Sequence, residues 1–106
     1  MATFEDFKKL EIKVGKVIKV EDHPNAEKLY LLTLDVGDKT IQLVAGIKPF
    51  YGVSDLEGKL IPVVVNLEPK NIRGVESEGM ILAAESSDDV SVLTSDKNIE
   101  PGSIVR

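Results

Sequence analysis

Short apolar segments separated by turn residues run along the whole chain. Residues 12–20 alternate polar and apolar side chains, and further apolar runs of strand length occupy residues 28–36, 40–47, 59–67 and 80–84. Alternation over such short stretches predicts half-buried β-strands. With five segments of this kind and no long run of helical periodicity, the pattern indicates one β-rich unit.

The connections between these segments carry turn and capping residues. The dipeptide Gly37-Asp38 predicts a tight hairpin that pairs the second and third segments antiparallel. Ser54 and Glu57 have the spacing of a capping box and are followed at once by glycine, which predicts one helical turn between the third and fourth strands. At Gly15 the alternation of the first strand loses phase, and we expect a bulge or sharp coil there.

A helical turn is also predicted ahead of the first strand. Thr3 is a good capping residue, and Phe4, Phe7 and Leu10 would lie on one side of the turn that it starts. This spacing is typical of side chains that pack into a core, and we expect the rings to be buried.

The order of the elements is typical of one architecture. Five short strands with a helical turn between the third and fourth form the layout of the OB-fold, a five-stranded Greek-key barrel; the pattern alone also fits an SH3-like barrel. We predict an all-β OB-fold in a single domain, residues 1–106, with the barrel over about 11–84 and a C-terminal extension over 85–106. Because such a fold serves many functions, the function has to be argued from the site.

The composition excludes several kinds of chemistry. The chain has 106 residues, no Cys and a single His, His23, so disulfides, thiolate catalysis and clusters of Cys or His around a metal are ruled out. No nucleophile is paired with a base, and we expect neither enzymatic activity nor a cofactor. His23 is expected to shape a turn with Pro24 and Asn25. No secretion signal or membrane-length apolar run is present, which predicts a cytoplasmic protein.

The charges are unevenly distributed along a chain whose formal net charge is -5. Five cations and one acid lie between Lys8 and Lys19, whereas seven acids and one cation lie between Glu76 and Glu100. A polyanion responds to the local field within about a Debye length, roughly 8 Å at physiological ionic strength. A cationic face can therefore bind nucleic acid on an acidic molecule. The alternative is that these lysines only flank strands and block edge pairing.

The few aromatic residues limit which polyanion fits. Proteins that bind single strands without sequence preference stack the bases on several rings. Five rings are present: Phe4, Phe7, Tyr30, Phe50 and Tyr51. We expect most of them in the core. RNA with a folded structure, which proteins recognise by backbone shape and hydroxyl contacts, fits this inventory better than an unstacked strand.

The segment "NLEPKNIRGVESEGMILAA", residues 66–84, resembles the signature of the tRNA-binding domain found at the C-terminus of many methionyl-tRNA synthetases and in free-standing tRNA-binding proteins. The resemblance extends through "KVGKV", "HPNAEKLYLLTLDVGD" and "VAGI" and covers nearly the whole chain. It implies an OB-fold that binds tRNA by shape and backbone, as a β subunit or trans-acting cofactor of methionyl-tRNA synthetase. Since the sequence begins with Met and has no catalytic domain, it looks most like a free-standing member, with an excised domain as the alternative.

The family resemblance and the charge argument together predict the RNA-binding residues. The resemblance implies Lys28, Asn66, Arg73, Ser77 and Met80, and charge adds Lys13, Lys16 and Lys70. Cations can neutralise phosphates, amide and hydroxyl groups can bond phosphate or ribose oxygens, and methionine offers an adaptable apolar contact. Three alternatives stay open: Met80 in the core, Asn66 as a turn cap and Ser77 on a local backbone group. Glu76 and Glu78 either point away from the phosphates or orient Arg73.

Two further expectations concern partners. Six apolar residues follow the predicted barrel: Val90, Val92, Leu93, Ile99, Ile104 and Val105. They need apolar cover, which predicts a homodimer built by residues 85–106, as in free-standing members of the family; the alternative is that this segment folds back on its own barrel. The start, "MATFEDFKKLEIKVGKV", also resembles the homodimeric CsaA-type export chaperones, so peptide binding is the alternative function. We otherwise expect tRNA and a synthetase as partners, and no membrane.

Overall fold

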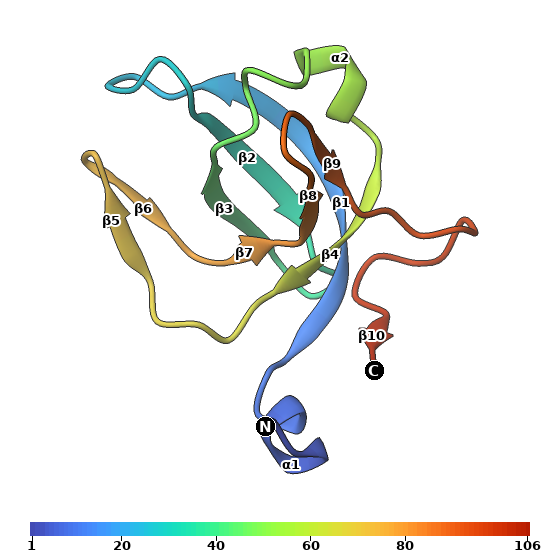
Figure 1. Cartoon of the computed structure of the whole chain (residues 1–106). Helices are drawn as coiled ribbons and strands as arrows, with labels where there is room; N and C mark the ends of the chain where they lie inside the picture. The colour runs from blue at the N-terminus through green and yellow to red at the C-terminus, as the bar shows by residue number, and fades with distance from the viewer.

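The computed structural model describes residues 1–106 as a small β-barrel with two short helices (Figure 1). The elements in chain order are α1 (Phe4–Lys8), β1 (Ile12–Asp22), β2 (Tyr30–Asp35), β3 (Thr40–Ala45), α2 (Val53–Leu56), β4 (Leu60–Val64), β5 (Lys70–Ile72), β6 (Val75–Ser77), β7 (Met80–Ile81), β8 (Ala83–Glu85), β9 (Val90–Val92) and β10 (Ile104–Val105). The main sheet runs β3-β2-β1-β4-β7, β10 pairs with β1, and β5–β6 and β8–β9 form separate hairpins. Neither helix is long and apolar enough to cross a bilayer.

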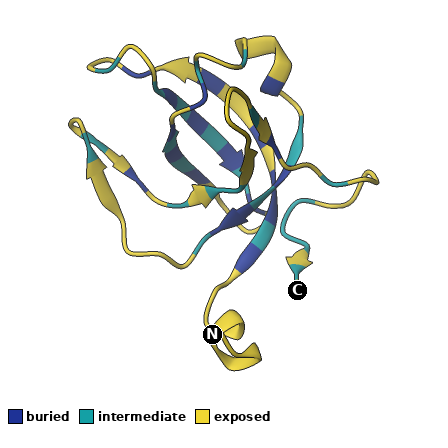
Figure 2. Cartoon of the chain, in the orientation of Figure 1, coloured by how far each residue is buried: buried dark blue, intermediate teal, exposed yellow.

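The core lies between the long strands of the barrel, where Figure 2 shows the buried residues in dark blue. Every second residue of β2 and β3 is buried, as the apolar alternation predicts. The two strands pair antiparallel through the predicted hairpin: the Val36 N–H donates to the Lys39 carbonyl at 3.0 Å, and Gly37 has a φ of 101°. This mostly β, nearly closed barrel confirms the predicted OB-like fold.

The irregularity expected at Gly15 lies further along β1. Gly15 pairs regularly with Ile61 of β4, and the register between β1 and β2 shifts between Val17 and Lys19. A Cβ atom at position 15 would lie 3.0 Å from Cγ2 of Val63. The glycine therefore allows close packing inside the barrel, and the bend of the strand comes after it.

The helical turn between β3 and β4 is present, but its cap differs from the predicted one. The backbone N–H of Gly52 donates to the Asp55 carboxylate at 2.8 Å, and helix α2 starts directly after this glycine. The expected pairing of Ser54 with Glu57 is wrong. Leu56 is fully buried in the core, and its burial sets how the turn is placed on the barrel.

Helix α1 extends away from the barrel in Figure 1. Thr3 caps it as predicted, because its hydroxyl accepts from the Asp6 N–H and its own N–H donates to the Asp6 carboxylate. The hydrogen bond from the Thr3 backbone holds the pKa of Asp6 below its usual range. No residue of α1 is buried, and Phe4 and Phe7 are 72% and 41% exposed. Their expected place in the core is wrong, since the helix stands beyond the end of the barrel. The same expectation is wrong for Phe50, which is 44% exposed.

Residues 66–84 contain more structure than the sequence predicted. The connection after β4 forms the β5–β6 hairpin, whose tip is Arg73-Gly74. The predicted strand over 80–84 is divided: β7 pairs with β4, whereas β8 pairs with β9. The chain thus leaves the barrel sheet after β7.

Residues 85–106 fold back along the barrel. Val92 is buried in the core, and β10 pairs with the start of β1. The Gly102 N–H donates to the Val14 carbonyl at 2.7 Å, which fastens the end of the chain to β1. Three of the six apolar residues of this segment remain exposed: Leu93 (43%), Ile99 (45%) and Ile104 (67%).

Candidate nucleic-acid interface

One histidine connects the loop after β1 to the β5–β6 hairpin. The His23 side chain is only 5% exposed; its Nδ1 accepts from the Asn25 backbone N–H at 2.9 Å, and its Nε2 lies 2.9 Å from the Ile72 carbonyl oxygen. Because a backbone N–H can only donate, Nδ1 is the acceptor and Nε2 carries the proton that Ile72 accepts. The ring therefore bridges two backbone segments that lie 49 residues apart in sequence.

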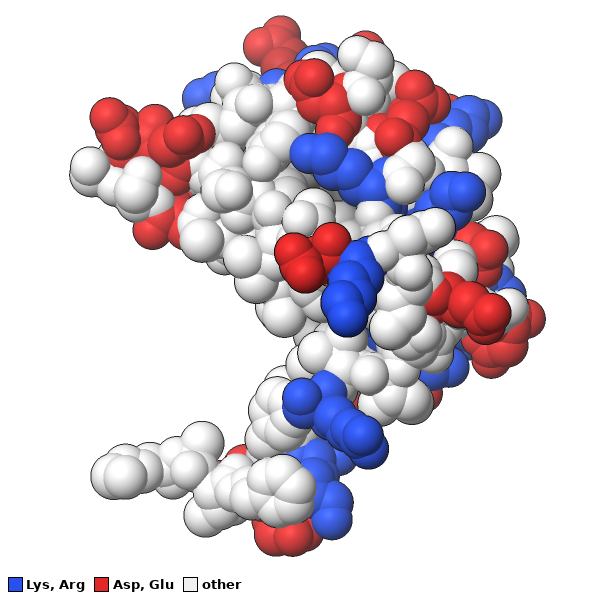
Figure 3. Space-filling model, turned by 90° about the vertical axis from the view of Figure 1, so that its right-hand side faces the viewer, with Lys and Arg blue, Asp and Glu red and all other residues white.

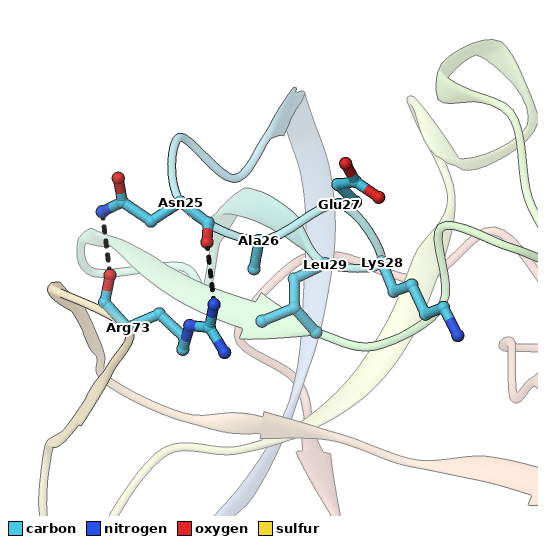
Figure 4. Close-up of a pocket in the computed structure, with 6 residues that line it drawn as sticks. All are labelled: Asn25, Ala26, Glu27, Lys28, Leu29 and Arg73. Atoms are coloured by element: carbon cyan, nitrogen blue, oxygen red, sulfur yellow. Dashed lines mark hydrogen bonds between the residues drawn. The ribbon is translucent and has the colours of Figure 1, made fainter.

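Asn25 forms a second link between the same two elements (Figure 4). Its Nδ2 donates to the Arg73 carbonyl at 2.9 Å, and Nη2 of Arg73 donates to the Asn25 carbonyl at 3.3 Å. Within the hairpin, Oδ1 of Asn71 accepts from the Gly74 N–H at 2.9 Å. Arg73 and Gly74 both have positive φ, 55° and 92°, as a two-residue hairpin turn requires. Hydrogen bonds on both sides thus hold the tip in place.

An open cavity of about 620 Å³ lies between this tip and the loop after β1. It is lined by Asn25, Ala26, Glu27, Lys28, Leu29 and Arg73. Figure 4 shows the Lys28 and Arg73 side chains on opposite sides of Ala26 and Leu29. Neither cation is among the residues that form ion pairs with carboxylates. The structure therefore brings together two predicted RNA-binding residues with their charges available to a ligand.

A second, smaller cavity of about 250 Å³ lies among β3, β5, β6 and β7. It is lined by Val44, Leu67, Glu68, Lys70, Ile72, Ser77, Gly79 and Met80. Met80 is 49% exposed, which excludes the alternative that it is a core residue. Lys70 forms no ion pair with a carboxylate. Three more of the predicted RNA-binding residues, Lys70, Ser77 and Met80, therefore share one cavity.

Ser77 and Glu78 join β3 to the segment between β6 and β7. Ser77 is 6% exposed, and its hydroxyl accepts from the Val44 N–H at 3.0 Å and donates to the Gly79 carbonyl at 3.3 Å. The Glu78 carboxylate accepts from the Gln42 N–H at 2.9 Å, and the Glu78 N–H donates to the Gln42 carbonyl at 2.9 Å. Glu78 is thus turned toward β3. Ser77 serves backbone groups, and an RNA contact by this residue stays a prediction.

Asn66 anchors the N-terminal segment to the barrel. Its Oδ1 accepts from the Glu11 N–H at 2.7 Å, and its Nδ2 donates to the Lys9 carbonyl at 2.8 Å. Both polar groups of the side chain are therefore engaged with the residues that connect α1 to β1. Its predicted contact with RNA is likewise untested.

Four of the five lysines from Lys8 to Lys19 lie close to a carboxylate. The Lys13 side chain is 18% exposed, and its Nζ lies 3.5 Å from a Glu11 carboxylate oxygen and 3.8 Å from one of Asp38. Three further lysines of this stretch lie 3.1 to 3.8 Å from a carboxylate: Lys8, Lys9 and Lys19. Lys16 is exposed and forms no such pair. Figure 3, which faces the side away from the β5–β6 hairpin, shows basic and acidic side chains interspersed.

Sequence reasoning missed the link that His23 and Asn25 make to the hairpin. The turn itself was predicted, and the hydrogen bond from the Asn25 N–H to the ring confirms it. The partners on the hairpin, however, are 48 and 49 residues away along the chain. The pattern of a single sequence carries no signal for such a distant pair.

Comparison with known proteins decides the family. A family model described as "Putative tRNA binding domain" matches residues 12–104. The chain belongs to this family. Within it, the methionine–tRNA ligase of Pyrococcus horikoshii is 50% identical over 103 residues, which are 97% of this chain and 14% of that protein. The chain therefore spans about a seventh of the length of the curated relative that it matches.

Solved structures of similar proteins confirm the fold of this tRNA-binding domain. A methionyl-tRNA synthetase related protein from Pyrococcus horikoshii matches with a TM-score of 0.94 and 36% identity, covering 100% of this chain and 98% of that chain. The CsaA chaperone protein from Picrophilus torridus matches with a TM-score of 0.92 and 37% identity over 100% of both chains. Both resemblances inferred from sequence are confirmed, and the fold does not separate the two.

Proposed function

We propose that the protein binds tRNA through its folded shape and phosphate backbone, with little dependence on base sequence. The observation that carries this proposal is that Lys28 and Arg73, two cations without an ion pair, line one cavity. The links from His23 and Asn25 to the hairpin hold Arg73 in place there. Lys70 adds a third cation, at the start of β5 in the same hairpin that carries Arg73. Contacts of this kind neutralise phosphates and position the nucleic acid without reading its bases.

The distribution of ion pairs supports this site over the basic stretch before and within β1. A lysine that already faces a carboxylate, as Lys13 and Lys19 do, has its charge partly balanced inside the protein. An unpaired cation instead displaces counterions from the RNA, which is the source of electrostatic affinity. Lys28, Lys70 and Arg73 belong to the second group, with Lys16 as a further unpaired cation on β1. The net charge of -5 therefore does not oppose RNA binding at this face.

Titration of several tRNAs at a series of salt concentrations tests this function. Arg73→Ala is expected to weaken all of them alike and to reduce the slope of log affinity against log salt by about 0.7 to 0.9, the loss of one phosphate contact. Lys19→Ala is the matched control, because Lys19 lies 3.1 Å from Glu21, and its slope should change less. Weakened binding of one tRNA species alone, with an unchanged slope, would contradict the proposal.

The partner that we propose is methionyl-tRNA synthetase, which the protein would serve in the cytoplasm as a β subunit or trans-acting cofactor. The 50% identity to part of a methionine–tRNA ligase supports this assignment. Added to a methionyl-tRNA synthetase that lacks such a domain, the protein is expected to lower the KM for tRNA and to leave kcat nearly unchanged, because it contributes binding and no catalytic group. An unchanged KM would refute the partnership and leave tRNA binding intact.

Peptide binding by a CsaA-type chaperone is the second candidate. The 37% identity and full coverage of the CsaA protein from Picrophilus torridus favour it. The two functions separate in a competition experiment, in which labelled tRNA bound to the protein is challenged with an unfolded polypeptide and with unlabelled tRNA. We expect displacement by tRNA only. Tight binding of the polypeptide with no measurable affinity for tRNA would establish the chaperone function instead.

We also propose that the protein forms a homodimer through the side of the barrel that carries residues 85–106. Leu93, Ile99 and Ile104 stay exposed after this segment has folded back. A second copy of the chain would give these apolar side chains the cover that the barrel does not give. Two copies related by a two-fold axis would extend the RNA contact along one tRNA. Light scattering should show a dimer that Ile104→Lys disrupts. A wild-type protein that is monomeric at tens of micromolar, yet binds tRNA at full strength, would show that pairing is unnecessary.

A further inference from the structure

The smaller cavity, among β3, β5, β6 and β7, has walls that suit a flat apolar ligand. Its apolar side chains are Val44, Leu67, Ile72 and Met80. Met80 and Leu67 are 49% and 39% exposed, so two large apolar groups face solvent around one hollow. At about 250 Å³ the cavity is smaller than the 300 to 1,000 Å³ of ordinary small-molecule pockets, and it accommodates a single ring system better than a whole cofactor.

The one hydroxyl group in the lining of this cavity is already hydrogen-bonded within the protein. The Ser77 hydroxyl is committed to the Val44 N–H and the Gly79 carbonyl. A Cβ atom at position 79 would lie 2.9 Å from the Val64 carbonyl oxygen, so only glycine keeps the backbone this close to β4. A ligand in the cavity is therefore held by apolar contact, and the polarisable thioether of Met80 can adapt to a flat ring.

The rim of the cavity carries charges that match a nucleotide. Lys70, on β5, is an unpaired cation at the edge, and the same strand leads to Arg73 three residues later at the other cavity. A backbone whose phosphates follow Arg73 and Lys70 would pass directly over the apolar walls. Glu68, also at the rim, can accept a hydrogen bond from an amino group on a base edge, as acidic side chains do with cytosine.

We propose that this cavity receives one unstacked base of the bound RNA. The inference rests on the proposed tRNA binding and adds a requirement for an unpaired base, such as those in the loops of a folded tRNA, beside the phosphate contacts. The occupant is a nucleobase rather than a peptide side chain because an unpaired cation, Lys70, lines the same cavity as the apolar walls, and Arg73 lies on the same hairpin at the other cavity. The exposed rings that would otherwise stack a base, Phe4, Phe7 and Phe50, do not line this cavity.

Met80→Ala tests the proposal through the salt dependence of binding. Its affinity for tRNA should fall about three- to tenfold, because covering the exposed half of a Met side chain contributes roughly half of its full burial. The log-log salt slope should not change, since an apolar contact releases no counterion. This differs from Arg73→Ala, which reduces the slope. Leu67→Ala should behave like Met80→Ala, and Val53→Ala, on α2, nearly as exposed as Leu67 but outside both cavities and the proposed dimer surface, should change nothing.

A blunt-ended RNA duplex, in which every base is paired and stacked, separates base insertion from backbone binding. Met80→Ala should bind this duplex as well as the wild type does, while its affinity for tRNA falls. The inference would be overturned if Met80→Ala lost the same affinity for the duplex as for tRNA. It would also be overturned if Met80→Ala lost affinity for neither while the wild-type protein binds tRNA. Either result would leave the proposed function standing. If Met80→Ala weakens only the binding of an unfolded polypeptide, the cavity takes a peptide side chain and the inference is wrong. A wild type without affinity for tRNA would remove both proposals.

Discussion

His23→Phe tests whether the hydrogen-bonded link between the loop after β1 and the β5–β6 hairpin controls RNA binding. Phenylalanine fills a similar space but can neither accept from the Asn25 N–H nor donate to the Ile72 carbonyl, which the His23 ring does at 2.9 Å each. The second link, between Asn25 and Arg73, would remain. The hairpin is then joined to the loop after β1 by this second link alone, and Arg73 is placed less firmly beside the cavity that it shares with Lys28.

The structure bounds the size of the effect. A buried polar group that loses its partner costs about 1 to 3 kcal/mol, but Asn25 is exposed and Ile72 is only partly buried, so water can replace part of each bond. We therefore expect the free energy of unfolding to fall by about 1 to 2 kcal/mol in total. The loss of tRNA affinity should not exceed that of Arg73→Ala, because His23 acts by placing this side chain.

A double-mutant cycle with Arg73→Ala is the decisive assay. Thermal melting gives the stability of each variant, and tRNA titration gives its affinity. If His23 acts through Arg73, the effect of His23→Phe on affinity should largely vanish in the Arg73→Ala background. Additive effects, within about 0.5 kcal/mol, would refute this reasoning. His23→Gln, whose amide can donate to the Ile72 carbonyl, is expected to recover part of the lost affinity.

Two other variants test the polar residues that join distant segments. Ser77→Ala should lower the free energy of unfolding by about 1 to 3 kcal/mol, because the Val44 N–H loses its acceptor. The tRNA affinity of the folded protein should stay nearly unchanged. A lower tRNA affinity with an unchanged melting temperature would instead indicate the RNA contact that the family signature implies. Asn66→Ala should release α1 and speed hydrogen exchange at the Glu11 amide, which bonds to Oδ1 of Asn66 at 2.7 Å. Unaltered protection of this amide would contradict the anchoring role.

The barrel was predictable because its signals are local. Alternation along residues 28–36 and 40–47 needs only neighbouring residues to be recognised, and the Gly37-Asp38 turn between them is equally local. The predictions that proved wrong concern positions whose burial depends on packing against residues far away in the sequence. Phe4 and Phe7 have the spacing of core residues, yet no part of the barrel lies opposite the helix that carries them. Gly15 breaks the alternation because Val63 approaches it from another strand.

The sequence was enough to nominate the cations of the candidate site, but it did not show what the polar residues of the site do. A family signature marks Asn66 and Ser77 as significant without saying whether RNA or the fold requires them. Their partners lie 55 and 33 residues away, on Glu11 and Val44, and only the folded chain brings them within hydrogen-bond distance. Whether a cation is free or paired likewise depends on residues that only the fold brings beside it.

Lys13 and Lys28 have the same side chain and lie only 15 positions apart, yet one faces Glu11 and Asp38 and the other faces an open cavity. What distinguishes a binding cation from a structural one is therefore the carboxylate that the fold places beside it. Among the predicted RNA-binding cations, this criterion separates Lys13 from the four that form no ion pair, Lys16, Lys28, Lys70 and Arg73. Local charge of this kind is what can let an acidic protein attract a polyanion.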